Sequence, residues 1–487
     1  MNKAIIVGGG IAGLATTYYL HNKAAEAGTP VDCTLIESEP RFGGKIATTR
    51  RDGFVIEGGP DSFITQKPWA LELARELGLS DRLLGTNDER RKVYVLSNGR
   101  LVELPDGVML VVPTKITPFV TSSLISWPGK LRMGLDLVIP RRHDDGDESL
   151  ADFIRRRLGQ EALDKIAEPL MAGIHVADPE HLSLQATFPR LIDLERKYGS
   201  LIRGMLAARR VRPRDGTGKG EIRNPKSEIR NPKSMFVSLR GGLAELVSAL
   251  VDHLNQHVRL LAGRRVERVD FRPNGPSAYG VKLSDGTTLQ ADAVVLATPA
   301  FVAANLVATF NPQLAAGLRQ IRYVSTATIS LGFCRSDFGH PLDGFGFVIP
   351  SSESRKIAAC TWTSAKFDHR APDDHVLLRT FVGGAHDEHL VDLDDDTMIQ
   401  MVQDELADIM GVTAEPTVIE IFRWEKGNPQ YDVGHLERVE ALEAMCEPGL
   451  FLAGSAYHGV GLPDCVRGGK QVAEQAVVYL NDSSQRD

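Results

Sequence analysis

Residues Lys3 to Gly13, KAIIVGGGIAG, decide the fold of this chain. The apolar run from Ala4 to Val7 predicts a strand, and the apolar stretch from Ile11 to Leu20, directly after the glycines, is typical of a helix. A second apolar run, Cys33 to Ile36, ends at Glu37 and predicts another strand. The order strand, helix, strand predicts an α/β nucleotide-binding fold.

The glycines of this stretch have the spacing GxGxxG, at Gly8, Gly10 and Gly13. The first permits a tight turn, the second lets the backbone approach a pyrophosphate, and the third allows close packing of the helix, whose N-terminus stabilises the anion. Glu37 follows at the end of the second strand, where an acid can accept hydrogen bonds from an adenosine ribose. A glycine triplet alone is a weak signal, but together these features predict a dinucleotide site.

The residues after Glu37 favour FAD over NAD. They read ESEPRFGGKIAT and place Arg41, Gly43, Gly44 and Lys45 directly behind the ribose-binding acid. The basic side chains, together with the backbone of the two glycines, which no side chain covers, suit a second contact with the phosphates.

This ExxxRxGGK motif resembles the extension of the dinucleotide-binding motif that is found in the flavoprotein superfamily of amine oxidases, phytoene desaturases and porphyrinogen oxidases. Six further motifs make the chain similar to bacterial porphyrinogen oxidases of the soluble type that oxidises coproporphyrinogen III. Relatives of these enzymes oxidise protoporphyrinogen IX. They are EGGPDSF (57–63), PTKITPF (113–119), EPLMAGIHVADPEHLSL (168–184), ACTWT (359–363), RWEKGNPQYDVGH (423–435) and GVGLPDCV (459–466). The chain departs from the family pattern at Gly59 and His175.

The resemblance implies a complete set of cofactor contacts. Glu57 to Pro60 line the flavin, the Val266 backbone meets the adenine, Trp424 flanks the isoalloxazine, and Val460 to Leu462 close its far side. The full predicted set is Gly8, Gly9, Gly10, Ile11, Ala12, Gly13, Glu37, Ser38, Arg41, Gly43, Gly44, Lys45, Glu57, Gly58, Gly59, Pro60, Val266, Trp424, Gly459, Val460, Gly461 and Leu462.

The resemblance also implies the reaction, a six-electron aromatisation of the macrocycle in haem biosynthesis with molecular oxygen as acceptor. Since the flavin supplies the difficult chemistry, no catalytic acid, base or metal is nominated. Lys67 matches a basic position of the family and is the candidate for binding a propionate, and Ile174 and His175 are further substrate candidates. As a partner we expect the next enzyme of the haem pathway.

Three other functions stay open at this point. The first is oxidation of protoporphyrinogen IX, because the number of propionates depends on the shape of the pocket. The second is an amine oxidase or carotenoid desaturase, against which RWEKGNPQYDVGH and GIHVADPEHLS argue. The third is an escort protein that has kept the fold without catalysis.

The amino-acid composition argues against several classes of function and favours one cellular compartment. A net charge of -7 does not suggest nucleic-acid binding. The five cysteines are scattered without a CxxC pair, which argues against a disulfide framework, a zinc site or an iron-sulfur cluster and favours the cytoplasm. The apolar-rich stretch Val108 to Pro140 is interrupted by charges and prolines, so an internal helical region is favoured over a surface resting on the inner face of the membrane.

The expected fold class is α/β: a discontinuous Rossmann-like FAD-binding domain, a mixed-sheet substrate domain and a helical middle region. The FAD-binding domain is assigned to residues 1–47, 239–300 and 438–487, and the substrate domain to residues 48–103, 211–238 and 301–437. Residues 104–210 form the middle region, in which Ser149 to Gly204 show helical periodicity. The tandem EIRNPKS repeat of residues 221–234 is interpreted as a surface insertion.

Overall fold

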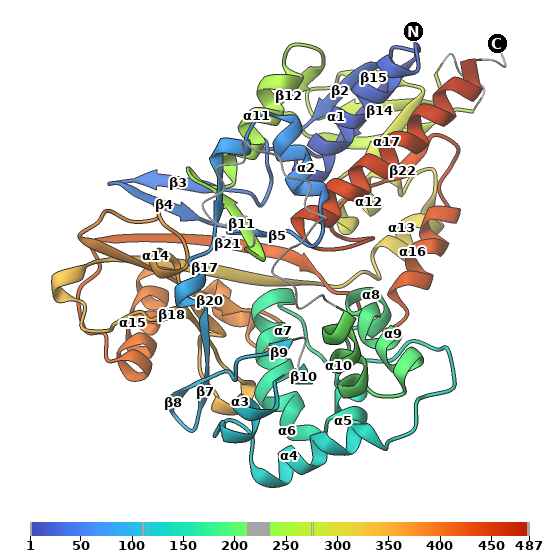
Figure 1. Ribbon diagram of the computed structural model, residues 1–487. Helices are drawn as coiled ribbons and strands as arrows, with labels where there is room; N and C mark the ends of the chain where they lie inside the picture. Colours follow the sequence, from blue (N-terminus) through green and yellow to red (C-terminus); the bar gives the residue numbers. More distant parts are fainter. Residues whose placement is uncertain are drawn as a thin grey trace.

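The computed structural model describes residues 2–109, 112–113, 115–211, 234–273, 275 and 277–484. A parallel five-stranded sheet in the order β12-β2-β1-β16-β22 organises one end of the molecule (Figure 1). Its strands are β1 (Lys3–Val7), β2 (Asp32–Ile36), β12 (Arg259–Leu261), β16 (Ala293–Leu296) and β22 (Leu450–Leu452). Helix α1 (Ile11–Glu26) joins β1 to β2, so the strand, helix, strand prediction is confirmed.

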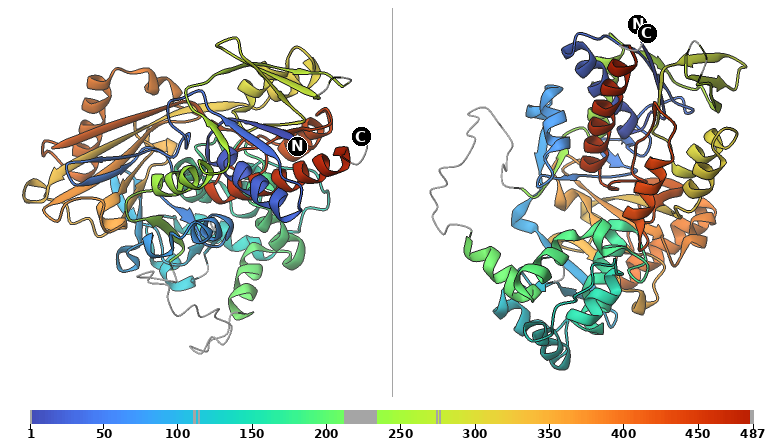
Figure 2. Two further views of the ribbon diagram at one scale, coloured as in Figure 1. Left: turned by 90° about the horizontal axis from the view of Figure 1, so that it is seen from above. Right: turned by 90° about the vertical axis from the view of Figure 1, so that its right-hand side faces the viewer.

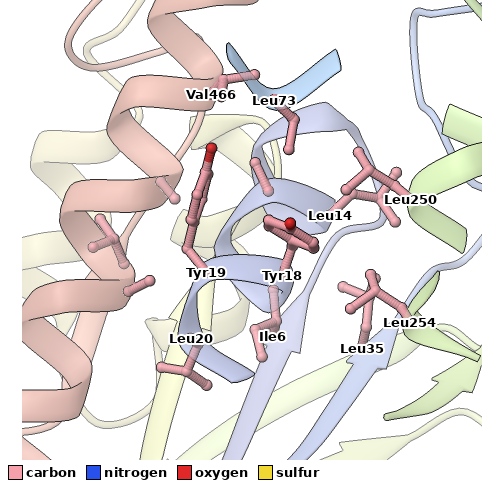
Figure 3. Packing of buried hydrophobic residues seen from close by; sticks show 14 of the residues in the cluster. Ile6, Leu14, Tyr18, Tyr19, Leu20, Leu35, Leu73, Leu250, Leu254 and Val466 are labelled. Carbon is pink, nitrogen blue, oxygen red and sulfur yellow. The ribbon is translucent and has the colours of Figure 1, made fainter. Parts of the chain in front are cut away.

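The first part of helix α1 is buried on all sides, from Ala12 to Leu20, because its residues there are small or largely apolar. It lies between α17 (Leu462–Ser484) and α11 (Ala244–Leu254), with α2 (Trp69–Glu76) near its start (Figure 3). Tyr19 points toward α17 and Leu14 toward Leu250 of α11. This packing fixes the glycine loop that precedes α1, and it brings the two ends of the chain together (Figure 2).

The second sheet has seven strands in the order β21-β17-β20-β19-β18-β7-β8. They are β21 (Val418–Pro429), β17 (Tyr323–Cys334), β20 (His375–Gly383), β19 (Ala359–Trp362), β18 (Gly344–Val348), β7 (Lys92–Ser97) and β8 (Arg100–Glu103). All neighbours are antiparallel except β18 and β7, so the expected mixed sheet is confirmed. Ile329 and Leu331 pack with helix α15 (Asp395–Met410) on one face, and alternate residues such as Thr328 face a cavity on the other.

The middle of the chain forms the helical end of the molecule, opposite the termini (Figure 1). Its elements are α3 (Ile116–Thr121), α4 (Trp127–Gly134), the 3-10 turn η3 (Leu135–Leu137), α5 (Leu150–Arg157), α6 (Gln160–Ala162), the π-helical turn η4 (Leu163–Ala167), α7 (Glu168–His175), α8 (Leu184–Thr187), α9 (Pro189–Tyr198) and α10 (Leu201–Val211). Helical structure over residues 149–204 is therefore confirmed.

The expectation that residues 108–140 are internal is correct for one side of this segment only. Leu124, Ile125 and Met133 are buried. Six apolar side chains are instead 37% to 72% exposed; they are Val120, Trp127, Leu131, Leu135, Leu137 and Val138, and we call them the apolar patch. Residues four apart share one face of a helix, so Trp127 and Leu131 project outward while Met133 packs inward.

Smaller elements connect these layers. The remaining strands are β3 (Thr48–Arg51), β4 (Phe54–Glu57), β5 (Phe63–Ile64), β6 (Leu83–Gly85), β9 (Val108–Met109), β10 (Val112–Pro113), β11 (Phe236–Leu239), β13 (Val266–Phe271), β14 (Tyr279–Leu283) and β15 (Thr288–Ala291). The remaining α-helices are α12 (Ala300–Val307), α13 (Pro312–Leu318), α14 (Thr363–Lys366) and α16 (His435–Ala444). Of the EIRNPKS repeat, residues 221–233 lie outside the described residues. In the described part of the chain, every helix is too short or too polar to span a bilayer.

Candidate cofactor and active site

The predicted glycine loop has the geometry that its spacing requires. Gly8 has a φ of 107°, a conformation that side chains disfavour. A side chain at Gly13 would overlap the Gly8 carbonyl oxygen, whereas the space beside Gly10 is open. Gly10 pairs with Gly43 in an isolated bridge, so the two glycine-containing segments lie side by side. Open backbone at the start of a buried helix suits a phosphate group.

Glu37 is fixed at the end of β2. Its side chain is 9% exposed, and one carboxylate oxygen accepts the Gly9 N–H at 2.7 Å. The other accepts from the Ser38 hydroxyl at 3.0 Å and from the Glu39 N–H at 2.9 Å. These bonds hold the carboxylate beside the loop, where it suits the ribose of a bound dinucleotide.

A cavity of about 2780 Å³ runs from this loop to the seven-stranded sheet and the helical end. Ligand pockets typically measure ~300–1,000 Å³, so the cavity has room for a dinucleotide and a second large molecule. Most of the predicted cofactor residues line it: Gly8, Gly10, Ile11, Ala12, Glu37, Ser38, Arg41, Gly43, Gly44, Lys45, Gly58, Gly59, Pro60, Val266, Trp424, Gly459, Val460, Gly461 and Leu462. The structure thus brings together residues from both ends of the chain.

Three predicted cofactor residues are absent from the cavity lining, namely Gly9, Gly13 and Glu57. The Glu57 carboxyl points toward α11, where it accepts the Leu243 N–H and the Thr48 hydroxyl, each at 2.7 Å. The Glu57 side chain therefore supports the wall of the cavity from the side that faces away from it. The backbone of Ile174 and His175 belongs to α7, but their side chains lie outside the described residues.

The Gly58 carbonyl oxygen is held by three strands of the large sheet. It accepts from the Thr328 hydroxyl at 3.0 Å, from Arg379 Nη2 at 3.1 Å and from the Trp424 indole N–H at 2.9 Å. A side chain at Gly59 would overlap the Lys45 carbonyl oxygen, which explains why this chain has glycine there. The sheet thus fixes the turn predicted to line the flavin, and with it the ring of Trp424.

A buried charge cluster behind this turn was not predicted from the sequence. Asp61 pairs with Lys366 at 2.8 Å, and Arg379, which is 4% exposed, donates to the Gly59 carbonyl at 2.5 Å. Burial alone would raise the pKa of Asp61, but the positive charges of Lys366 and Arg379 lower it below its usual range. The only local signal was an arginine inside the otherwise apolar run VLLRTFVG.

The predicted substrate cation, Lys67, lines the cavity in an ion pair. Its ammonium group lies 2.6 Å from a carboxylate oxygen of Asp464, which is 5% exposed and belongs to the GVGLPDCV text. Arg467 approaches the other oxygen of Asp464 at 3.7 Å. Lys67 is therefore positioned by the segment that begins α17. Lys45 is more enclosed: its ammonium group donates to the Gly427 carbonyl, and burial lowers its pKa.

The RWEKGNPQYDVGH text supports the glycine turn before α17. The Tyr431 hydroxyl accepts the Gly459 N–H at 2.7 Å and donates to the Ser455 carbonyl at 2.8 Å. The ring of His435 stacks on that of Tyr431 with 3.8 Å between the centroids, and its Nε2 lies 2.9 Å from the Tyr457 carbonyl oxygen. Because a carbonyl only accepts, Nε2 carries the proton of a neutral imidazole.

His435 should make the protein acid-sensitive. Burial lowers the pKa of this fully buried imidazole to about 4, so between its usual value and pH 4 the unfolded chain binds the proton more readily than the folded chain. Folding stability is therefore lost as the pH falls through this window, by roughly 2–3 kcal/mol at pH 4.5. We expect His435→Gln to unfold with a smaller difference between pH 7 and pH 4.5 in chemical denaturation. An equal pH dependence in both proteins would refute this role of His435.

Comparisons with known proteins agree with this geometry. The family model of flavin containing amine oxidoreductases matches residues 11–477. Coproporphyrinogen III oxidase of Bacillus subtilis is 37% identical over 98% of this chain and 98% of its own length. Chloroplastic protoporphyrinogen oxidase 1 of Spinacia oleracea is 30% identical over 99% of this chain and 85% of its own. A solved structure from Exiguobacterium sp. 255-15, named as a protoporphyrinogen oxidase, has 34% identity and a TM-score of 0.83, covering 98% of this chain and 99% of that one.

The residues of the site fit the cofactor of that family. The cradle at Gly10 and Gly13, the fixed Glu37 carboxylate and the size of the cavity suit FAD, and they argue against an escort protein that has lost its cofactor site. The fold and the match over nearly the whole chain extend this likeness to the substrate half. The chain therefore belongs to the flavin containing amine oxidoreductase family and is an FAD-dependent oxidoreductase.

Proposed function

We propose that this protein oxidises coproporphyrinogen III to coproporphyrin III in haem biosynthesis, with molecular oxygen as electron acceptor. The observation that carries the proposal is the 37% identity over nearly the full length of both chains with a coproporphyrinogen III oxidase. The size of the cavity supports it, since a flat macrocycle must lie beside the cofactor. Oxidation of protoporphyrinogen IX is the second candidate, because relatives with that name match over a similar share of the chain.

The residues that line the cavity divide the work. Bound FAD would accept electron pairs, and we propose that the predicted cofactor set holds it, with Gly8 to Gly13 and Glu37 at the adenosine end. Gly58, Trp424 and Val460 would face the isoalloxazine. The chain itself would orient a methylene bridge and exclude water. We propose that the FAD-binding domain with the ranges given above holds the cofactor and that the substrate domain with its ranges holds the macrocycle.

Turnover tests the proposed function. Purified flavin-loaded protein is given coproporphyrinogen III and protoporphyrinogen IX in parallel under air, while porphyrin fluorescence and peroxide are followed. We expect a higher kcat/KM for coproporphyrinogen III and peroxide formation in step with oxidation. A preference for protoporphyrinogen IX would favour the second candidate. Activity on neither substrate would refute both and leave an amine or a carotenoid as the substrate.

Replacing Lys67 by Ala should weaken substrate binding. Loss of the ammonium group removes the contact proposed for a propionate, so we expect KM to rise about tenfold, the effect of ~1.4 kcal/mol, with a smaller change in kcat. Lys67→Arg serves as the control that keeps the charge. Because Lys67 also neutralises the buried Asp464, flavin content is measured on each variant. An unchanged KM together with lost flavin would assign Lys67 to the cofactor loop instead.

We also propose that the apolar patch rests on an anionic membrane surface. The patch lies at the end of the molecule farthest from the termini (Figures 1 and 2). Trp127 is 64% exposed, the ammonium group of Lys130 lies 4.7 Å from its ring, and Arg141 is exposed nearby. Exposed aromatic and aliphatic side chains beside cations are typical of helices that lie in a bilayer interface.

Liposome sedimentation tests this contact. We expect wild-type protein to pellet with vesicles that contain anionic lipid, and the double variant Trp127→Ser, Leu131→Ser to bind at least about tenfold more weakly, since two large apolar groups lose their burial. Val478→Ser is the matched control, because Val478 is 60% exposed on α17 near the opposite end. No pelleting of wild-type protein, or a concentration-dependent dimer that the double variant abolishes, would overturn the proposal.

For the cellular setting we propose the cytoplasm, with the protein peripheral on the inner face of the membrane. A product released at that surface would be passed to the next enzyme of the haem pathway.

A further inference from the structure

Helix α7 is bracketed by two unusual backbone conformations. The π-helical turn Leu163–Ala167 precedes it, and Val176, which ends it, has φ 52° and ψ 31°. π-Helical turns occur frequently at functional sites, and a β-branched residue in the left-handed region is strained. Both Val176 and the first residue of the helix, Glu168, line the cavity. Strain of this kind persists where the surrounding structure imposes it, as it does at ligand sites.

Glu168 is a buried carboxyl group without a cation. It is 9% exposed, and one oxygen accepts the Ser351 N–H at 3.1 Å. Among the described residues no lysine, arginine or histidine forms an ion pair with it. The charged groups that act on it are Asp164 in the π-helical turn and Asp178 after the helix. Asp178 in turn faces His181, at 2.9 Å, and His386.

An unpaired carboxyl group is unexpected in a cavity proposed to receive a substrate with four carboxylates. Burial, followed by the repulsion of Asp164 and Asp178, raises the pKa of Glu168 to about 7, although the Ser351 N–H opposes the shift. The group can therefore exchange a proton near neutral pH. The centre of a porphyrinogen carries four pyrrole N–H groups, which are hydrogen-bond donors that suit a carboxylate.

We propose that Glu168 contacts the macrocycle as the base that takes the proton released in each two-electron oxidation. This inference rests on the proposed function. In each step a C–H bond at a bridging carbon would break, and its hydrogen would leave with the electron pair, for which bound FAD would be the acceptor. Over the three steps the macrocyclic cation loses two N–H protons and one proton from the fourth bridging carbon, and each proton in turn forms an O–H bond on the Glu168 carboxylate. The substrate would be oxidised by two electrons and bound FAD would be reduced by two; oxygen would reoxidise the flavin, and Glu168 would return the proton to water, before the next step.

Anaerobic reduction of the bound flavin by coproporphyrinogen III tests this step apart from the reaction with oxygen. In wild-type protein we expect the rate of flavin reduction to rise with pH around pH 7, so that its pH profile has a limb there. We expect Glu168→Gln, which keeps an oxygen for the Ser351 N–H, to lose that limb and to react about 100-fold more slowly. Substrate affinity should change little, and Glu168→Asp should recover part of the rate.

Glu405→Gln is the matched control. Glu405 is 7% exposed and also accepts a backbone N–H, from Lys356 at 3.0 Å, but it lies on α15 outside the cavity lining. A Glu168→Gln rate within threefold of wild type, or a wild-type profile without a limb between pH 6 and 8, would overturn the inference. Flavin content identifies variants that fail to fold. If Glu168→Gln fails to fold, the pH profile of the wild-type rate tests the inference instead. If wild-type protein oxidises neither porphyrinogen, the proposed function fails instead.

Discussion

Replacing Gly13 by Ala is expected to abolish stable binding of FAD. The added methyl group would overlap the Gly8 carbonyl oxygen, which belongs to the backbone and cannot move without opening the loop. Because this loop begins α1 and meets the Gly43 segment, its displacement changes the whole phosphate cradle. We expect the Kd for FAD to rise at least about 100-fold, or ~2.7 kcal/mol, and the purified protein to be colourless. Flavin fluorescence during titration of apoprotein measures the change.

Two other glycines separate the possible causes. At Gly10 the neighbouring space is open, so Gly10→Ala should fold normally and still lose FAD affinity, because the methyl group would meet the pyrophosphate. At Gly468 in α17 the space is also open, so Gly468→Ala should keep its flavin and gain stability of about 1 kcal/mol from helix propensity. Full flavin content in Gly13→Ala would show that the loop tolerates displacement.

The second large effect is expected at the Arg157 and Asp136 pair, both of which are fully buried. Arg157 Nε donates to Asp136 at 2.6 Å, and its other nitrogens donate to the carbonyls of Ile139 and Gly199, each at 2.9 Å. These bonds join α5 to the segment that carries the apolar patch. Arg157→Met leaves the Asp136 carboxylate buried without its cation, with only the Ser200 hydroxyl and the Ile202 N–H as donors, so we expect the free energy of unfolding to fall by about 3–5 kcal/mol.

Chemical denaturation monitored by circular dichroism measures this loss. Arg155→Ala is the control on the same helix, because Arg155 pairs at the surface with Asp152 at 2.8 Å and should contribute under about 1 kcal/mol. The double variant Asp136→Asn, Arg157→Met should recover part of the loss, since position 136 then no longer buries a charge without its cation. Equal stability of Arg157→Met and Arg155→Ala would contradict the expected importance of the buried pair.

The sequence was sufficient for those features that local patterns determine. Strand β1, helix α1 and Glu37 follow from hydrophobic periodicity and glycine spacing within one continuous stretch, and the structure places them as predicted. The helical region of residues 149–204 also follows from periodicity, and the mixed sheet follows from runs rich in β-forming residues. The predicted cofactor set came partly from the glycine spacing and partly from motifs shared with the family, and most of its members line one cavity.

The features that were missed depend on contacts between distant positions. Arg379 has meaning only beside Asp61 and the Gly58 carbonyl, and Lys67 has its partner Asp464 near the other end of the chain. Periodicity predicts that α4 is amphipathic, but it does not show whether another element covers the apolar side. Glu168 was noted only as part of a motif, because its burial and lack of a cation arise from tertiary packing.

The order of the strands in the parallel sheet has a consequence for how the protein is made. Strand β1 emerges early, yet its neighbour β16 spans residues 293–296 and the edge strand β22 spans residues 450–452. Helix α17, which packs along α1, follows later still. A ribosome must therefore synthesise the chain from β1 to at least residue 462 before the cofactor cradle can close. Chains that stop short of residue 462 are expected to expose the apolar surface of α1, which favours aggregation, while flavin loading marks a chain whose synthesis has passed residue 462.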